Sequence, residues 1–292
     1  MLVFVFRLLG RLPLVWVHRL GALAGWLAYL GSARHRHTLR ENLARAVGEV
    51  RARELRRAAI AACGQQILEL AWVWQRPLDE VLAKIVRVEG EHHIRDAQAA
   101  GRSLLVLTPH LGCFELCSIW FGTHMGSCTV LYRPPRQRAL EPILLAGRER
   151  GQVRLAAANA HGVRMLVRTL REGGTVGILP DQTPKSGDGI WATFFGKPAW
   201  TMTLAARLSE LRNVDVLMMR AERLPRSAGY VLHIRPPAPP VAGELAARAQ
   251  AINHAIEHEI LASPAQYLWA YPRYKVPGEA APLPPEFSAP AT

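Results

Sequence analysis

A histidine and a glutamate, His110 and Glu115, follow the apolar run of residues 103–108. The run has the composition of a buried strand, and Pro109 keeps Thr108 extended and marks where the strand ends. A histidine at a strand end can act as a general base. We expect the carboxylate of Glu115, in the first turns of the following helix, to accept a hydrogen bond from one imidazole nitrogen. The other nitrogen is then free to take a proton.

Such a pair suits the activation of a hydroxyl group. In serine hydrolases an acid orients a histidine in the same way, but this sequence has no GxSxG motif to supply the serine. The nucleophile is therefore expected to be a hydroxyl of a substrate. The alternative is a structural histidine that is bonded at the start of a helix.

The pattern of apolar runs predicts the elements that position this pair. From about residue 85 onward, the runs SLLVLT, CTVLYR, VRLAAA and TVGILP each precede a helical pattern, over residues 113–124, 139–150, 162–172 and 199–210. This alternation predicts an α/β domain with a mostly parallel central sheet flanked by helices. DVLMMRAER and YVLHIRP predict an antiparallel hairpin at the sheet's edge, and a last helix is expected over 243–261. In the helical segment 58–74, the spacing of Ile67, Leu70, Ala71 and Trp74 predicts a buried face.

Composition indicates a large core and a polyanionic partner. Half of the 292 residues are hydrophobic, and 36 Lys and Arg against 23 Asp and Glu leave a net charge of +13. The four cysteines form no CxxC pair, so we expect reduced thiols. His110, Cys113 and Cys117 lack a fourth ligand at a zinc-site spacing, so no metal is expected.

The first 32 residues predict a membrane anchor helix. Arg7, Arg11 and His18 fall on one side of an otherwise apolar helix, and the uninterrupted run 20–30 is too short to span a bilayer. We expect this helix to lie in or dip into the interface, and the eight arginines of residues 34–57 to attract anionic lipid. A cleaved signal peptide and a helix packed on its own domain remain alternatives. The catalytic domain is expected over 33–276, followed by a disordered proline-rich tail over 277–292.

Several motifs resemble one enzyme family. TPHLGCFEL (108–116) resembles the H-x4-E motif of the late acyltransferases of lipid A biosynthesis, the lauroyl and myristoyl transferase family. The resemblance covers nearly the whole chain and continues through YRPPRQ (132–137), GVRMLVRTLREGGTVGILPDQTPKSGDG (162–189), FFGKPAWT (194–201) and QYLWAYPRYK (266–275). It implies a glycerolipid-acyltransferase-like fold around the central sheet.

The resemblance also implies an activity and a location. The enzyme is expected to move a fatty acyl chain from acyl carrier protein to a hydroxyl of a lipid A precursor, a step of lipopolysaccharide biosynthesis. This implies the cytoplasmic face of a bacterial inner membrane, with His110 as the base and Glu115 as its partner. No cofactor is implied beyond the acyl-acyl carrier protein that serves as co-substrate.

The same resemblance suggests substrate-binding residues. Arg133 is expected to bind a phosphate or a developing oxyanion, and Asp181 and Gln182 of the LPDQ segment are further candidates. Gly187 and Gly189 are expected in a substrate loop. Phe195, with Phe194 and Trp200, is expected to line an acyl channel. Some of these residues also have a structural alternative: a helix or turn cap for Asp181, ordinary turns for the glycines, and core packing for the aromatic residues.

Two further functions remain to be weighed. The first keeps the chemistry but uses another amphiphile, such as an ornithine lipid or a glycolipid, and is suggested by Pro272 in the closing motif. The second is a non-catalytic basic protein that binds nucleic acid. The sequence has no RNP, KH or helix-turn-helix signature, so we expect no nucleic-acid partner.

Overall fold

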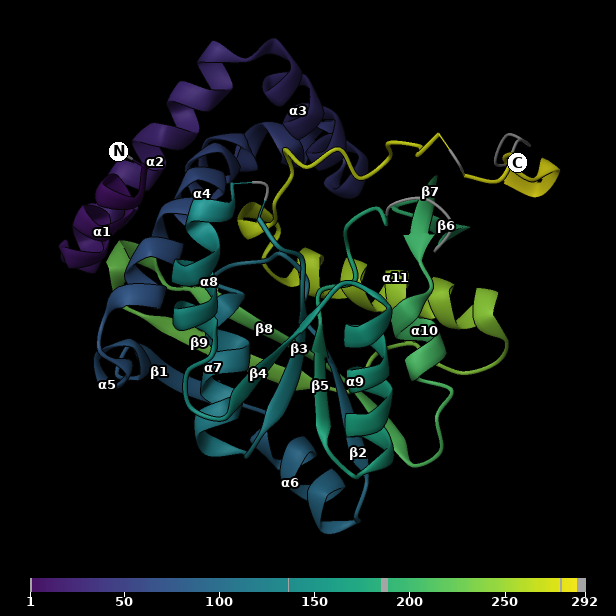
Figure 1. Ribbon diagram of the computed structural model, residues 1–292. Coiled ribbons are helices and arrows are strands. Elements are labelled where there is room, and N and C mark those ends of the chain that lie inside the picture. Colours follow the sequence, from purple (N-terminus) through teal and green to yellow (C-terminus); the bar gives the residue numbers. More distant parts are fainter. Residues whose placement is uncertain (1, 136, 185–188, 279, 288–292) are drawn as a thin grey trace.

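A seven-stranded sheet organises the chain (Figure 1), for which the computed structural model describes residues 2–135, 137–184, 189–278 and 280–287. The strand order is β1-β9-β8-β2-β5-β3-β4, and the strands from β8 to β4 run parallel. The bounds are β1 Ile85–Glu89, β2 Ser103–Leu107, β3 Cys128–Tyr132, β4 Val153–Ala157, β5 Thr175–Ile178, β8 Val214–Arg223 and β9 Tyr230–Arg235. The predicted α/β class with a mostly parallel central sheet is confirmed.

The antiparallel hairpin β8–β9 is also present, but its predicted place at the edge is wrong. β8 pairs with β2 on its other side, and β9 pairs in parallel with β1, which forms the edge. β1 and β9 are more than a hundred residues apart in sequence, so a local sequence pattern cannot predict that they pair.

Alternate residues of the strands serve two cores, one on each face of the sheet. Leu105, Leu107 and Ile178 pack with α9 Ala160–Arg171, α10 Leu204–Leu208 and α11 Leu245–Ala262. Leu104 and Val106 face the opposite core with α6 Glu91–Ala99 and α7 Glu115–His124, while α8 Glu141–Arg148 lies beside α7 and β4. The period of two explains why these strands are apolar on both sides.

A small hairpin replaces the first half of the helix predicted over 199–210. β6 Gly189–Phe194 pairs with β7 Lys197–Met202, and only α10 is helical in this region. Phe195 and Gly196 form the turn with φ of 46° and 69°, and the indoles of Trp191 and Trp200 meet across the two strands. A cross-strand aromatic pair and a two-residue turn with positive φ favour a hairpin over a helix.

The chain begins with four helices, α1 Leu2–Arg11, α2 Leu14–Gly31, α3 Ala33–Val47 and α4 Glu49–Gln75. α2 lies along α4 at very short range (Figure 1), because glycines face each other: a Cβ on Gly64 would stand 2.0 Å from the carbonyl oxygen of Gly21. α2 is therefore part of the folded body. Among the described helices, none combines the length and the apolar character that crossing a bilayer requires.

The outward side of α1 and α2 is apolar. It exposes nine large hydrophobic side chains: Phe4, Val5, Leu8, Val15, Trp16, Leu20, Leu23, Leu27 and Leu30. The predicted cationic side of this segment is only partly present: Arg7 and Arg11 are exposed, but His18 is buried, with 4% of its surface exposed. The helix stops at Arg11 and restarts after Pro13, so the constant angle per residue that related these positions does not hold.

The predicted buried face of α4 is partly wrong. Ala71 is buried, but Ile67 is 52% exposed, and the polar Gln66 and Glu69 point inward instead. α4 contacts α2 as well as α7, α8 and the 3-10 turn Pro264–Gln266, so a single apolar stripe does not describe it.

The proline-rich tail is described as far as residue 287, except residue 279. The indole nitrogen of Trp191 donates to the carbonyl oxygen of Ala281 at 2.8 Å, and Pro285–Phe287 forms a short 3-10 turn. Residues 288–292 lie outside the described part, and disorder of the tail stays a prediction.

Candidate active site

Three neighbouring strands end at one edge of the sheet, and a predicted site residue follows each of them. His110 follows β2, Asp181 follows β5 and Arg133 follows β3. Reactive groups of parallel α/β sheets gather at the carboxyl ends of the strands. The topology thus brings together residues that are far apart in sequence.

The backbone around His110 is fixed by hydrogen bonds from several elements. Leu268 N–H donates to the carbonyl oxygen of His110 at 3.2 Å, and Gly112 N–H donates to Gln266 O at 3.1 Å. Gly112 has φ of 58°, and a Cβ there would stand 1.9 Å from the carbonyl oxygen of Ala221. Only glycine fits this turn, which directs the chain from β2 into α7.

The partner of His110 is Asp181. Its Oδ1 lies 2.8 Å from His110 Nδ1, and its Oδ2 accepts the backbone N–H of His110 at 2.9 Å. Gln182 Nε2 lies 3.2 Å from His110 Nε2. The carboxylate thus fixes both the ring and the main chain of the histidine.

The electrostatics of Asp181 determine the tautomer of the imidazole. Asp181 is 1% exposed; burial raises its pKa, but the charge of His110 and the hydrogen bonds from His110 outweigh that effect and hold the pKa below its usual value. An ionised carboxylate only accepts hydrogen bonds, so His110 Nδ1 donates to Asp181, and Nε2 is the ring nitrogen beside the Gln182 amide. Nε2 is the atom available to take a proton from a substrate.

The predicted pairing of Glu115 with His110 is wrong. Both carboxylate oxygens of Glu115 accept from Arg148 Nε, at 3.0 and 2.9 Å, and Trp74 Nε1 donates to the carboxylate at 3.0 Å. A second nitrogen of Arg148 also contacts it. The helix α7 begins only at Glu115, after the left-handed turn at Gly112, so helical spacing does not relate Glu115 to His110.

We expect Glu115→Gln to destabilise the fold. The side chain of Glu115 is 3% exposed and that of Arg148 is 18% exposed, so the variant leaves a largely buried cation without its acid. We expect the free energy of unfolding to fall by about 2–4 kcal/mol, at or below the range for breaking a fully buried pair. Denaturant unfolding measures this. Glu172→Gln, which breaks the exposed pair with Arg168, is the control and should leave stability unchanged; equal stability of both variants contradicts the assignment.

A narrow cavity of about 40 Å³ lies between α7 and the sheet. It is mostly apolar, and the Glu115–Arg148 pair contributes to its wall. The other lining residues are Val106, Thr108, Phe114, Cys117, Ser118, Phe121, Cys128, Val130, Thr175, Gly177, Ile178, Leu179 and Met219. Phe194, Phe195 and Trp200 are not among the described residues that line it.

Among the described residues, none of the remaining predicted side chains shares a hydrogen bond or a ring contact with His110. Phe194 and Trp200 are buried in the core, and Phe195 packs against Trp269 with ring centroids 6.0 Å apart. Arg133 is exposed at its strand end. Gly187 lies outside the described residues, and Gly189 begins β6, where a Cβ would stand 2.2 Å from the indole nitrogen of Trp200.

The closing motif supplies neighbours of the site that the sequence analysis did not assign. Tyr267 is buried beside Asp181; burial raises the pKa of its hydroxyl, and the carboxylate raises it further. Arg273, 2% exposed, donates to Trp200 O at 2.8 Å and to Thr201 Oγ1 at 2.9 Å. Tyr271 Oη accepts the N–H of Thr183 at 3.0 Å, so the motif anchors the segment that carries Asp181.

Two more residues were missed, Gln66 and Arg148. Both are polar residues within largely apolar helical segments, and this is the signal that could have found them. Among the described residues, no cluster of three or more His, Cys, Asp and Glu side chains forms a metal site. Cys113 and Cys117 are buried thiols, and burial raises the pKa of both.

The α/β sheet with a histidine and an acid at its strand ends defines an enzyme-like site, and comparison with known proteins gives its class. Residues 1–276 match the family described as bacterial lipid A biosynthesis acyltransferase. The chain is 27% identical over 286 residues to the lipid A biosynthesis lauroyltransferase of Escherichia coli (strain K12), covering 95% of this chain and 91% of that protein. It is 30% identical over 210 residues to the lipid A biosynthesis palmitoleoyltransferase of the same organism, covering 70% and 66%.

A lipid A biosynthesis acyltransferase of Haemophilus influenzae (strain ATCC 51907 / DSM 11121 / KW20 / Rd) is 24% identical over 180 residues, covering 62% of this chain and 56% of that protein. The chain belongs to the bacterial lipid A biosynthesis acyltransferase family. It is an acyltransferase, and the predicted family and enzyme class are confirmed.

Proposed function

We propose that this enzyme transfers a fatty acyl chain from acyl carrier protein to a hydroxyl of a lipid A precursor at the cytoplasmic face of a bacterial inner membrane. Its family and its relatives' names support the acceptor class. The observation that carries the mechanism is the hydrogen bond between His110 Nδ1 and Asp181, which leaves Nε2 as the ring nitrogen that faces away from the carboxylate, toward Gln182.

The reaction needs one base and one balancing charge. The acceptor hydroxyl replaces the Gln182 amide at His110 Nε2, loses its proton to that nitrogen, and attacks the carbonyl carbon of the acyl thioester. An ester bond forms, the carbon–sulfur bond breaks, and the thiol leaves with the proton from the imidazolium. Asp181 stabilises the positive charge that His110 carries between these steps.

Other charged residues have separate roles in this proposal. Arg133, exposed at the end of the adjacent strand β3, binds a phosphate or stabilises the oxyanion. Glu115 positions Arg148 at the cavity wall and does not orient His110. The net charge of +13 favours docking of an acidic carrier protein, so transfer slows as the salt concentration rises.

The apolar outward side of α1 and α2 is the proposed membrane contact. It joins the arginine-rich α3 and the start of α4, where Arg36, Arg40, Arg53 and Arg56 line shallow pockets. Apolar side chains enter the interface while the arginines approach anionic headgroups. Removing residues 1–32 is a poor test, because it also removes the helix that packs on Gly64.

We expect the double substitution Leu23→Glu and Leu27→Glu to release the protein from vesicles that contain anionic lipid. Both side chains are more than half exposed, so the fold should persist while the membrane contact gains two charges. Vesicle sedimentation measures the bound fraction. Val86→Glu with Leu261→Glu, on β1 and α11, is the matched control and should still sediment. If the α2 variant sediments as fully as its control, α2 is not the membrane contact.

Deletion of the gene in its native host tests the acceptor. Mass spectrometry of extracted lipids should show lipid A lacking one acyl chain, and the intact gene should restore it. If lipid A is unchanged and an ornithine lipid or a glycolipid loses a chain instead, the acceptor assignment is wrong while the acyltransferase chemistry stands.

A further inference from the structure

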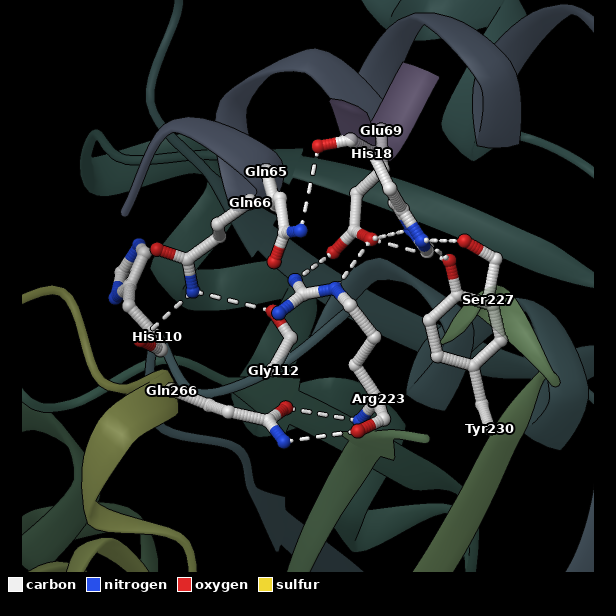
Figure 2. Close-up of polar contacts among 10 residues, drawn as sticks. All are labelled: His18, Gln65, Gln66, Glu69, His110, Gly112, Arg223, Ser227, Tyr230 and Gln266. Carbon is white, nitrogen blue, oxygen red and sulfur yellow. Dashed lines mark hydrogen bonds and ion pairs between the residues drawn. The ribbon is translucent and has the colours of Figure 1, made fainter. Parts of the chain in front are cut away.

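A buried polar network lies beside the His110 loop (Figure 2). It joins three consecutive layers of the fold: His18 of α2, Glu69 of α4, and Arg223 of β8 with Tyr230 of β9. Gln66, one helical turn before Glu69, extends from the same helix to the backbone of the candidate active site.

Both amide hydrogens of Gln66 are used on the His110 loop. Its Nε2 donates to the carbonyl oxygen of His110 at 2.9 Å and to that of Gly112 at 3.2 Å. The residue is 2% exposed, so neither bond competes with bulk water. Two carbonyls held by one amide fix the path of the chain on both sides of Leu111.

We propose that Gln66 is a positioning residue for the proposed acyl transfer: it holds the His110 loop so that the imidazole meets both Asp181 and the acceptor hydroxyl. The inference rests on the proposed function, because it assigns Gln66 a role through His110. Gln66 itself contacts the loop backbone and does not touch the reacting atoms.

The network gives Gln66 a rigid base. Glu69 accepts from Arg223 Nε at 2.9 Å and from Tyr230 Oη at 3.0 Å, and His18 Nε2 lies 2.9 Å from it. Burial alone raises the pKa of Glu69, but Arg223 and His18 outweigh it and lower the pKa to about 2. The ionised, fully paired carboxylate fixes this turn of α4 against the sheet.

The amide of Gln66 is retained at some cost. Its Oε1 is buried and has no hydrogen-bond partner among the described residues. A buried acceptor without a partner is unfavourable and calls for a reason. A donor that reaches two loop carbonyls supplies that reason, since an apolar residue of similar size would avoid the unpaired oxygen but lose both bonds.

Other contacts keep the loop folded when Gln66 is changed. Leu268 N–H also donates to His110 O, and Cys113 N–H donates to Ala221 O at 2.9 Å. The side chain of Gln266 accepts from the N–H of Arg223 at 2.8 Å and donates to its C=O at 2.9 Å, and the main-chain carbonyl of Gln266 accepts from the N–H of Gly112. Loss of the Gln66 amide should therefore shift the loop without unfolding it.

The test compares Gln66→Leu with Gln65→Leu. Gln65 is its neighbour on α4 and donates to the His18 carbonyl at 3.2 Å, so it shares the helix and lies beside the network. Within the part of the chain that the structure describes, its side chain makes no hydrogen bond to the His110 loop. Transfer from lauroyl-acyl carrier protein to a purified lipid A precursor is measured with the full-length protein. We expect Gln66→Leu to lower kcat about 10- to 100-fold with KM little changed, as a displacement of about 1 Å does, and Gln65→Leu to keep the parent kcat.

Gln66→Glu adds a second measurement, the pH dependence of kcat, which would not change if Gln66 were only a structural residue. A protonated, buried carboxyl can donate one of the two bonds, so its kcat should lie between those of the parent and Gln66→Leu, and should fall as pH rises and the proton is lost. This variant also serves if Gln66→Leu does not fold. If the folded Gln66 variants keep the kcat of the parent enzyme, the proposal is wrong. It is also wrong if Gln65→Leu loses as much kcat as Gln66→Leu. If His110→Ala retains full activity, the proposed function fails instead.

Discussion

His110→Ala is expected to lower the turnover of acyl transfer by about 10²- to 10⁴-fold, the usual cost of a lost general base. The alanine removes the only atom in the proposed mechanism, Nε2, that takes the proton from the acceptor hydroxyl. The fold should persist, because Asp181 keeps the backbone N–H of residue 110 as a partner. Turnover is measured with acyl-acyl carrier protein and lipid A precursor, beside the thermal unfolding temperature.

The control for this variant is His161→Ala, an exposed histidine on α9. It removes an imidazole from the surface and should change neither turnover nor unfolding. If folded His110→Ala acylates at the parent rate, His110 is a structural residue and another group must take the proton.

Asp181→Asn is expected to cause a loss of similar size for a different reason. The carboxylate accepts both the backbone N–H and the Nδ1–H of His110, whereas an asparagine amide has one acceptor oxygen and one NH₂ donor. The NH₂ group of the asparagine then faces a donor, either the backbone N–H or the Nδ1–H of His110. The imidazole can remove this conflict by carrying its proton on Nε2 instead of Nδ1. In a serine-protease triad, the matching change costs about 10⁴-fold because it leaves the wrong tautomer.

The pH dependence separates this effect from simple misfolding. The pKa of Asp181 is held below its usual value in the folded parent, so its contribution to stability is present at neutral pH and is lost only as pH falls through that lowered pKa. Asp181→Asn should abolish this loss at acid pH as well as lower kcat. Asp215→Asn, at the surface pair with Arg102, is the control and should leave kcat unchanged. If Asp181→Asn keeps the kcat of the parent enzyme, Asp181 is not the residue that orients His110.

Local patterns in the sequence predicted much of the sheet. Alternating apolar runs gave the strands β2, β3, β4 and β5 and most of their helices, since a buried parallel sheet needs continuous apolar strands. The β6–β7 hairpin was missed because its strands, with Lys197, Pro198 and Thr201, do not form a clean apolar run. Its stability comes from the Trp191–Trp200 contact and from a turn with positive φ.

The candidate site was only partly predictable. The sequence placed His110 at a strand end and the family resemblance added Asp181, and the structure brings these two side chains together. The choice between Asp181 and Glu115 as the partner of His110 depends on tertiary geometry. A helical turn between positions 110 and 115 would bring Glu115 to His110. In the structure Gly112 has a left-handed backbone, α7 begins only at Glu115, and the carboxylate of Glu115 pairs with Arg148. The inward orientation of His18 and Gln66 likewise depends on the tight contact of α2 with α4, which no single segment reveals.

The most direct test of this account is a single reaction with purified protein, lauroyl-acyl carrier protein and a lipid A precursor in anionic vesicles, followed by mass spectrometry of the lipid. We expect the precursor to gain one ester-linked lauroyl chain in the presence of the parent enzyme, and to stay unmodified with His110→Ala and with Asp181→Asn. If the folded, vesicle-bound parent forms no acyl ester with lauroyl- or palmitoleoyl-acyl carrier protein, the proposed reaction is wrong. If both variants form the ester at the parent rate, the assignment of His110 and Asp181 as the catalytic pair is contradicted.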